Sequence, residues 1–164
     1  MTHYSSQYVS ISHCAIDLNV AFDRFGQALE QLAGRFDPAA FPQACDSDSA
    51  QALIKRMEGE QGLMIFGKID HDFMFVMSGK PTKVLRYYIG NPSVIFSMTR
   101  HDVRAALCAP LSEVDAQTAC VEFDQPSSLF GQFGNRAVTE VDLQLDRKLR
   151  VLINEAAESA ALTR

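Results

Sequence analysis

Apolar residues recur at helical spacing near both ends of the chain. Near the amino end they stand three or four positions apart, at Leu18, Phe22, Phe25, Leu29, Leu32 and Phe36. Near the carboxyl end the same spacing holds for Val138, Val141, Leu145, Leu149, Leu152 and Ala156. Each pattern predicts an amphipathic helix with one buried face. The charged residues of the second helix are expected mostly outside its apolar stripe, namely Asp142, Asp146, Arg147, Lys148 and Arg150.

Shorter apolar runs outside these helices predict β-strands. They cover residues 8–15, where β-branched and polar residues alternate, and residues 63–70, 73–77, 84–89, 111–114 and 118–123. Because many of these strands are neighbours in sequence and long helices flank them, an antiparallel sheet with helices on one face is favoured. The sequence therefore predicts an α+β fold, with its main elements in the order β-α-β-β-α-β-β-α.

Residues 37–62 are expected to form an insertion within one domain that spans residues 1–164. Gly34 is expected to end the first long helix. The acidic and small residues 46–49 (DSDS) are interpreted as a solvated loop. A short helix is predicted from Ala50, Leu53, Ile54 and Met57, closed by Gly59 and Gly62.

Composition and net charge indicate which classes of binding partner the protein can have. Of the 164 residues, 47 % are hydrophobic and 21 % are charged, and the formal net charge is −5. These values are typical of a soluble globular domain. A general nucleic-acid-binding protein needs a broad basic face that releases counterions from phosphates, so no nucleic-acid partner is expected.

Cysteine spacing and the amino-terminal residues bear on the compartment. The four cysteines, Cys14, Cys45, Cys108 and Cys120, form no CxxC pair and no zinc-like set with histidine. The first residues (MTHYSSQ) lack the features of a signal peptide, and no apolar run approaches the roughly 18 residues of a membrane span. We therefore expect reduced cysteines, no metal site of this kind, no membrane partner and a cytoplasmic location.

The tripeptide Gly90-Asn91-Pro92 stands at a predicted strand-to-helix junction. Asn91 suits the N-cap and Pro92 the first helical position. The free N–H groups of such a junction can also hold a carboxylate or phosphate. Arg86, Tyr88 and Lys68, on nearby predicted strands, could complete an anion site.

Two interior histidines are candidates for chemistry. His71 follows Asp70, and a carboxylate beside an imidazole can raise its pKa and fix its tautomer, as general-base catalysis or metal ligation requires. The alternative is a polar strand end in water. His101 follows Arg100 where the helix that starts at Pro92 ends, and a cation there is favoured by the helix dipole. Both histidines could instead converge on one pocket, as metal or haem ligands or as acid–base partners.

Asp124 and Ser127 lie where the last predicted strand runs into a loop. This segment, residues 124–128 (DQPSS), offers one carboxylate and two hydroxyls. Because no GxSxG motif surrounds either serine, nothing marks a nucleophile. A hydroxyl-stabilised turn is the simpler interpretation.

Several of these segments together resemble the DUF302 family (domain of unknown function 302). They are residues 66–71 (FGKIDH), 88–92 (YIGNP), 100–102 (RHD) with 109–111 (APL), 123–127 (FDQPS) and 145–149 (LDRKL). The likeness covers a family-like core from about residue 62 to residue 152. It implies a TATA-binding-protein-like α+β fold, with a curved antiparallel sheet, two packed helices and frequent pairing into dimers. It implies no catalytic residues and no particular cofactor, because the role of the family is not established.

The favoured function from sequence is a homodimeric domain that binds a small anionic ligand. The expected pocket residues are Lys68, His71, Arg86, Asn91 and His101, with Asp70, Arg100, Asp124 and Ser127 as further candidates. Three alternatives stay open. They are an enzyme that uses His71 with Asp70 as acid or base, a histidine-ligated haem or metal protein, and an interaction module that pairs through its sheet face or edge.

Overall fold

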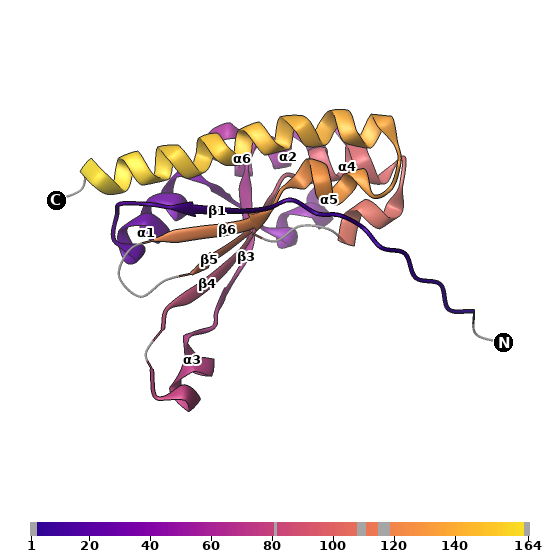
Figure 1. Cartoon of the computed structure of the whole chain (residues 1–164). Helices are drawn as coiled ribbons and strands as arrows, with labels where there is room; N and C mark the ends of the chain where they lie inside the picture. The colour runs from indigo at the N-terminus through magenta and orange to yellow at the C-terminus, as the bar shows by residue number, and fades with distance from the viewer. Residues whose placement is uncertain (1–2, 81, 108–110, 115–118, 163–164) are drawn as a thin grey trace.

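A curved sheet with helices packed against it forms the centre of the molecule (Figure 1). The computed structural model describes residues 3–80, 82–107, 111–114 and 119–162. Within them, six strands pair in the order β1-β6-β5-β4-β3-β2, with only β2 parallel to its neighbour. The strands are β1 (His13–Asp17), β2 (Gly34–Arg35), β3 (Met64–Asp70), β4 (Val84–Gly90), β5 (Leu111–Val114) and β6 (Cys120–Asp124). The α+β class and the antiparallel sheet predicted from sequence are confirmed.

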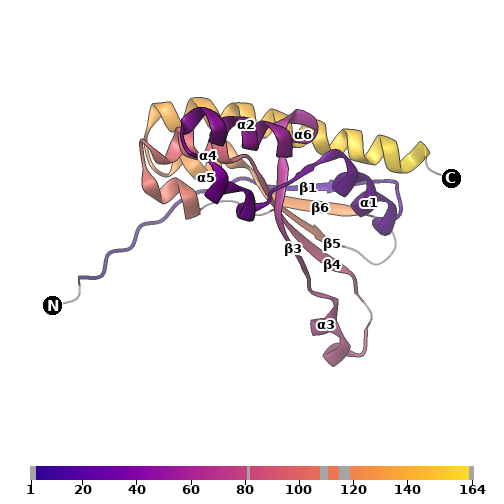
Figure 2. The same cartoon turned by 180° about the vertical axis from the view of Figure 1, so that it is seen from behind.

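Two long helices lie across one face of the sheet. They are α1 (Phe22–Leu32) and α6 (Arg136–Leu162). The other α-helices are α2 (Ser47–Met57), α3 (Asp72–Phe75), α4 (Pro92–Thr99) and α5 (Pro126–Gly131). Short 3₁₀ helices are η1 (Pro38–Gln43), η2 (Glu60–Gly62), η3 (Val76–Ser78) and η4 (Val103–Leu107). Figure 2 shows from behind how α6 runs above the sheet while α3 stands at the far end of the β3–β4 hairpin.

The core fills the space between the sheet and these two helices. Its fully buried side chains include Phe25 and Leu29 of α1, Tyr87 of β4, Val121 of β6 and Leu152 of α6. The predicted apolar stripes of both long helices therefore face the sheet. Burial of such stripes, rather than helix propensity, supplies most of the stability of helices in proteins.

The first strand lies later in the chain than predicted. β1 begins at His13, opposite Asp124 of β6, whereas residues 8–12 are exposed and belong to no strand. Alternating β-branched residues suit a strand, but a strand forms only where a neighbour offers backbone partners. The alternation that includes Val9 and Ile11 therefore predicted a strand in this part of the chain, but placed its start before His13.

The predicted strand over residues 73–77 is wrong, because this segment forms α3 and η3. The Asp70 carboxylate accepts a hydrogen bond from the Asp72 backbone N–H at 2.8 Å, and the Asp72 carboxylate accepts one from Val84 N at 2.7 Å. These contacts turn the chain out of the sheet. Phe73 and Met77 are consequently exposed at the tip of the hairpin.

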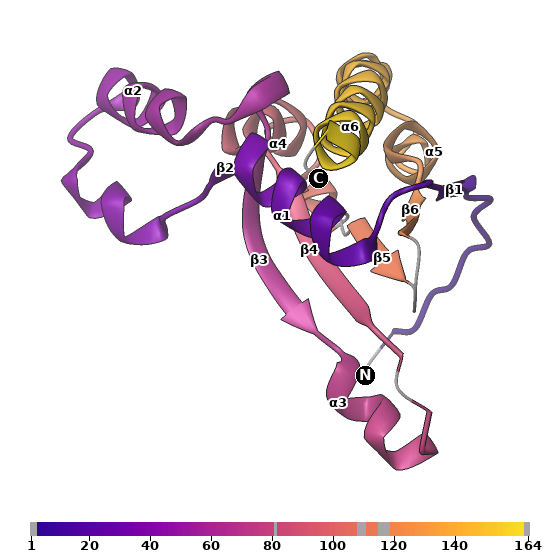
Figure 3. The same ribbon diagram turned by 90° about the vertical axis from the view of Figure 1, so that its left-hand side faces the viewer.

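Residues 46–49 are more ordered than a solvated loop. Asp46 and Ser49 form a capping box, in which the Asp46 carboxylate accepts a hydrogen bond from Ser49 N at 2.8 Å. Such a box satisfies backbone donors that a helix start leaves free. The predicted short helix is confirmed as the later part of α2, which Figure 3 shows beside the β2 edge of the sheet.

Two further expectations are corrected at the carboxyl end. Residues 126–128, predicted as loop, begin α5, because Asp146 of α6 accepts a hydrogen bond from Ser127 N at 3.0 Å. Asp142 and Asp146 are buried rather than outside the stripe of α6. The connection between the two strands predicted at residues 111–114 and 118–123, and Cys108, lie outside the described residues, in which Cys14, Cys45 and Cys120 form no disulfide.

Candidate functional site

A charged pocket opens between α1 and the β2–β3 edge of the sheet. We call it the charged pocket; it has a volume of about 320 Å³ and is lined by Glu30, Arg35, Phe36, Ile65, Phe66, Gly67, Lys68 and Tyr87. Strand pairing places Lys68 directly opposite Tyr87, and α1 brings Glu30 over them. Lys68 is the only sequence-predicted candidate among these lining residues.

Glu30 is the centre of the polar network in this pocket. One of its carboxylate oxygens, Oε1, accepts hydrogen bonds from Lys68 Nζ at 2.5 Å and from the hydroxyl of the buried Tyr87 at 2.8 Å. Partial burial of Glu30 opposes its ionisation, but the hydrogen bonds from Lys68 and Tyr87 outweigh that cost and lower its pKa. Glu30 is therefore an anion that holds the Lys68 ammonium in place.

Arg35 supplies a positive charge that Glu30 does not neutralise by contact. Among the described residues the Arg35 side chain makes no hydrogen bond or ion pair, although it lines the pocket and its charge helps to lower the pKa of Glu30. With Lys68 and Glu30 counted together as neutral, Arg35 leaves the pocket with a surplus positive charge. A guanidinium presents paired donors that match a carboxylate or phosphate.

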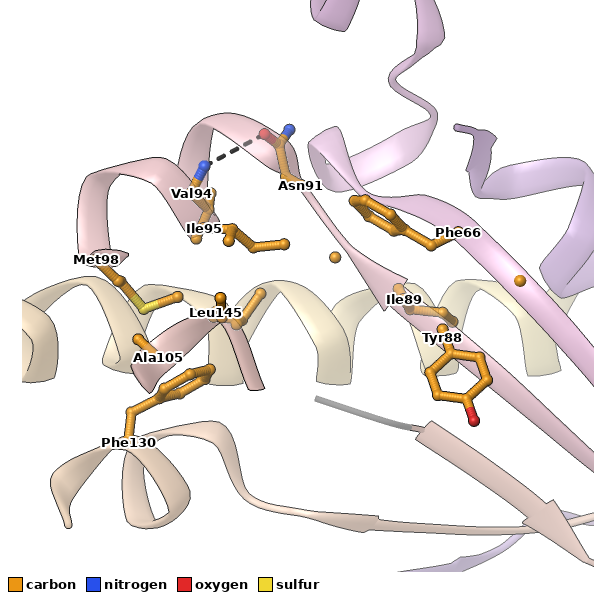
Figure 4. Close-up of a pocket in the computed structure, with 13 residues that line it drawn as sticks. Phe66, Tyr88, Ile89, Asn91, Val94, Ile95, Met98, Ala105, Phe130 and Leu145 are labelled. Atoms are coloured by element: carbon orange, nitrogen blue, oxygen red, sulfur yellow. Dashed lines mark hydrogen bonds between the residues drawn. The ribbon is translucent and has the colours of Figure 1, made fainter. Parts of the chain in front are cut away.

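A second pocket, almost entirely apolar, lies on the other side of Phe66. We call it the apolar pocket; its volume is about 260 Å³, and its walls come from β3, β4, α4, η4, α5 and α6. Figure 4 shows Ile95 and Met98 of α4, Phe130 of α5 and Leu145 of α6 around the space. No charged side chain is among its described lining residues.

The structure confirms Asn91 as the N-cap of α4, and the amide nitrogen of Asn91 makes two further hydrogen bonds. Its Oδ1 accepts hydrogen bonds from Ser93 N at 2.7 Å and Val94 N at 3.4 Å, and Pro92 begins α4. Its Nδ2 donates to Glu58 Oε1 and to the carbonyl oxygen of Gly62, both at 2.7 Å. Asn91 is therefore fully engaged by the protein, although its side chain borders the apolar pocket.

Asp70 and His71 are not paired with each other. The Asp70 carboxylate accepts its hydrogen bond from the Asp72 backbone, as described above, while the buried His71 Nδ1 has no hydrogen-bond partner within the part of the chain that the structure describes. His71 directly follows β3 at the tip end of the β3–β4 hairpin, where its backbone N–H donates to the carbonyl oxygen of Val84, the first residue of β4, at 2.9 Å. It lines neither the charged nor the apolar pocket.

Arg100 and His101 lie at the end of α4, as the sequence predicted, but both are exposed and neither lines the charged or the apolar pocket, in which they were expected. Arg100 Nε and His101 Nε2 are 3.2 Å apart. The whole of β4 and α4 separates His101 from His71, so the structure does not bring the two histidines together (Figure 1). Within the described residues, no group of three or more His, Cys, Asp or Glu side chains is placed to hold a metal ion.

The remaining candidates lie elsewhere. Asp124 contacts His13 rather than a pocket, and Arg86 is exposed on β4. Ser127 donates its backbone N–H to Asp146, and its hydroxyl accepts a hydrogen bond from Gln125 Nε2 at 3.2 Å.

His13 stands between two carboxylates on strands β1 and β6. Its Nδ1 lies 3.0 Å from Asp124 Oδ1, and its Nε2 lies 3.4 Å from Glu122 Oε2. The hydrogen bond with Asp124, with a smaller contribution from Glu122, raises the pKa of His13 despite some desolvation. Nothing in the sequence indicates this cluster, because His13 lies more than a hundred positions before both carboxylates.

Sequence reasoning missed Glu30, Arg35 and Tyr87 as members of a site. A usable signal existed for Tyr87, because it shares one face of its strand with the apolar residues Leu85 and Ile89, and a buried phenol needs a hydrogen-bond partner. Nothing in the sequence pairs that phenol with Glu30, which lies 57 positions away.

Comparisons with known proteins address the fold. No family model matches the chain, and no curated protein matches it. The chain is similar in structure to an uncharacterised conserved protein, DUF302, from Bacillus stearothermophilus, with a TM-score of 0.61 and 12 % sequence identity. The match covers 88 % of this chain and 97 % of that one. No described helix is both long and apolar enough to cross a bilayer. The chain therefore has a DUF302-like fold, as its sequence motifs predicted.

Proposed function

We propose that this protein binds a small anionic ligand in the charged pocket. The observation that carries this proposal is the network of Lys68, Glu30 and Tyr87 beside the unpartnered Arg35. The network fixes its own side chains, so a ligand meets donors that are already oriented. Preorganised donors cost less to order on binding.

The ligand group that suits this arrangement is a carboxylate. Arg35 can bind both of its oxygens, and the Lys68 ammonium retains donors beyond the one given to Glu30. A dianion is less suitable, because the Glu30 carboxylate also faces the pocket and would repel a second negative charge. Phe36 and Phe66, stacked with ring centroids 4.4 Å apart, add an apolar wall for the rest of the ligand.

A titration with sodium butyrate, followed by ¹H–¹⁵N NMR, tests this proposal. We expect saturable shifts of amides around Gly67 and Lys68, and loss of saturation in Arg35→Ala. Arg24→Ala is the matched control, because Arg24 is an exposed arginine of α1 outside both pockets. Absence of saturable shifts with butyrate, or equal effects of the two substitutions, would refute the charged pocket as an anion site.

Homodimer formation stays a prediction and needs its own measurement. Exposed apolar side chains at the hairpin tip, such as Val76 at 79 % and Met77 at 94 % exposure, favour an association that covers them. Sedimentation velocity should then give a dimer that Met77→Ser weakens. A monomer at all concentrations would contradict the prediction.

A further inference from the structure

Phe66 belongs to both pockets because of an irregularity in strand pairing. The register between β3 and β4 shifts between Ile65 and Gly67, so Phe66 has no partner residue on β4. Such a bulge re-aims a side chain. The Phe66 ring stacks on Phe36 at the charged pocket and also lines the apolar pocket, where Figure 4 shows it beside Asn91. Gly67, which has no side chain, lines both pockets too.

The apolar pocket can bind a ligand through apolar contacts, but the Asn91 side chain on its wall is not free to hydrogen-bond the ligand. Asn91, the polar side chain at its upper wall, gives both its oxygen and its amide to the protein, as described above. A Cβ at Gly90 would lie 3.5 Å from Phe66 and 3.6 Å from Ile95, so the absent side chain leaves space between those two walls. Dry apolar cavities of only about 150 Å³ bind benzene, and this pocket is larger, at about 260 Å³.

We propose that the ligand is an amphipathic monocarboxylate whose charged head occupies the charged pocket and whose apolar tail occupies the apolar pocket. This inference rests on the anion binding proposed above. The head contacts Arg35 and Lys68, the tail passes Phe66 above Gly67, and the tail ends among Ile95, Met98 and Phe130. By comparison with the benzene-sized cavity, the tail holds about six to eight carbon atoms.

A homologous series of straight-chain carboxylates tests the tail. Butyrate, hexanoate and octanoate carry the same head group and differ only in length. Because each methylene buried from water contributes about 0.8 kcal/mol, or about fourfold in affinity, we expect octanoate to bind up to about two hundredfold more tightly than butyrate. Isothermal titration calorimetry measures the affinities, and ¹³C-methyl NMR should show Ile95 and Met98 shifting with octanoate but not with butyrate.

A substitution that fills the apolar pocket serves as the matched variant for this series. Ala106 lines the apolar pocket yet is exposed, so Ala106→Phe can close the space without crowding the buried core. We expect this variant to bind butyrate as the unchanged protein does and to lose the gain with chain length. If the variant does not fold, the carboxylate series in the unchanged protein still tests the tail assignment.

The outcomes separate this inference from the function on which it rests. If butyrate and octanoate bind with equal affinity, and Arg35→Ala abolishes both, the tail assignment is wrong and anion binding holds. If butyrate does not bind saturably, the anion site is refuted and both proposals fail. If octanoate binds and Arg35→Ala leaves its affinity unchanged, the pocket takes apolar molecules alone and the amphipathic assignment is overturned.

Discussion

Gly34 and Gly59 bring two backbone segments into direct contact and share one acceptor. Both donate their N–H groups to the carbonyl oxygen of Leu63, at 2.9 and 3.1 Å. A Cβ on Gly34 would overlap the carbonyl oxygen of Met57, and a Cβ on Gly59 would overlap the backbone nitrogen of Gly34. The contact closes the segment that carries η1 and α2 and fixes the parallel pairing of β2 with β3.

Substitution of either glycine should therefore destabilise the fold. Because the obstacles are backbone atoms, which cannot rotate away, we expect Gly34→Ala and Gly59→Ala each to cost about 3 kcal/mol of unfolding free energy. Urea denaturation followed by circular dichroism measures this loss. In Gly131→Ala the new Cβ would meet nothing within 4 Å, so we expect this control to change stability by less than about 1 kcal/mol. Equal midpoints for Gly34→Ala and Gly131→Ala would contradict the close contact.

His13 should titrate above its ordinary pKa of 6.5, chiefly because of its hydrogen bond with Asp124. A raised pKa in the folded state means that the protonated imidazole favours folding. This contribution is fully present below the ordinary pKa and is lost as pH rises through the folded-state pKa. In Asp124→Asn we expect the His13 pKa to return toward its ordinary value, whereas Glu122→Gln should lower it less. NMR titration of the imidazole Cε1 proton decides this, and an unchanged pKa in Asp124→Asn would disprove the pairing.

Elements governed by neighbouring residues could be predicted from the sequence. Asn91 and Pro92 mark the start of α4 because an N-cap needs only a side chain that reaches the next backbone donors. The strand predicted over residues 73–77 was wrong for the opposite reason. An apolar run shows that a segment can be buried, but whether it joins a sheet depends on a free strand edge, which is decided elsewhere in the chain.

The site could be predicted only in part, for a similar reason. Lys68 was predicted as part of an anion site because it lies on a strand near the Gly90-Asn91-Pro92 junction, and the structure places it in the charged pocket. Its partners Glu30 and Arg35 reach the same pocket through the packing of α1 on the sheet and through the short strand β2. Gly34 precedes Arg35 and was interpreted as a helix end, whereas its structural role is the close contact with Gly59.

Asn91 should stabilise the fold through both ends of its amide. We expect Asn91→Ala to cost about 2 kcal/mol, because α4 loses its cap and Glu58 loses a donor. Asn91→Asp keeps the cap acceptor but places a carboxylate beside Glu58, whose pKa is lowered by hydrogen bonds from Lys55 and Asn91 that outweigh desolvation. The loss in Asn91→Asp should therefore be larger at pH 7 than at pH 4, where carboxylates begin to protonate.

Asn135→Asp is the matched control for this charge effect. Asn135 Oδ1 caps the start of α6 by accepting from Ala137 N at 3.0 Å, and its amide has no carboxylate partner among the described residues. A carboxylate at a helix start is favourable, so we expect no loss in this variant at pH 7. Equal losses for both Asp variants in urea denaturation would show that Glu58 is not the cause.

Asp142 is a buried carboxyl group of α6 with no hydrogen-bond partner for either oxygen among the described residues. Burial, and then the charge of Asp146 one turn away, raise the pKa of Asp142 from 3.8 to about 7. The folded state therefore binds a proton that the unfolded state releases between these two values. Its stability is greatest below about pH 4, falls as pH rises toward 7, and levels off above.

Asp142→Asn should remove this pH dependence, because the amide resembles the protonated acid and cannot ionise. We expect the variant to match the unchanged protein near pH 4 and to be more stable at pH 8 by roughly 2 to 4 kcal/mol. Urea denaturation across this pH range measures the difference. Glu140→Gln is the control, since Glu140 is an exposed residue of the same helix, paired with Arg136 at 3.0 Å, and surface pairs contribute at most about 1 kcal/mol. If Asp142→Asn gains no stability at pH 8, the carboxylate must find in solution a partner or a water that offsets its burial, and the raised pKa would be wrong.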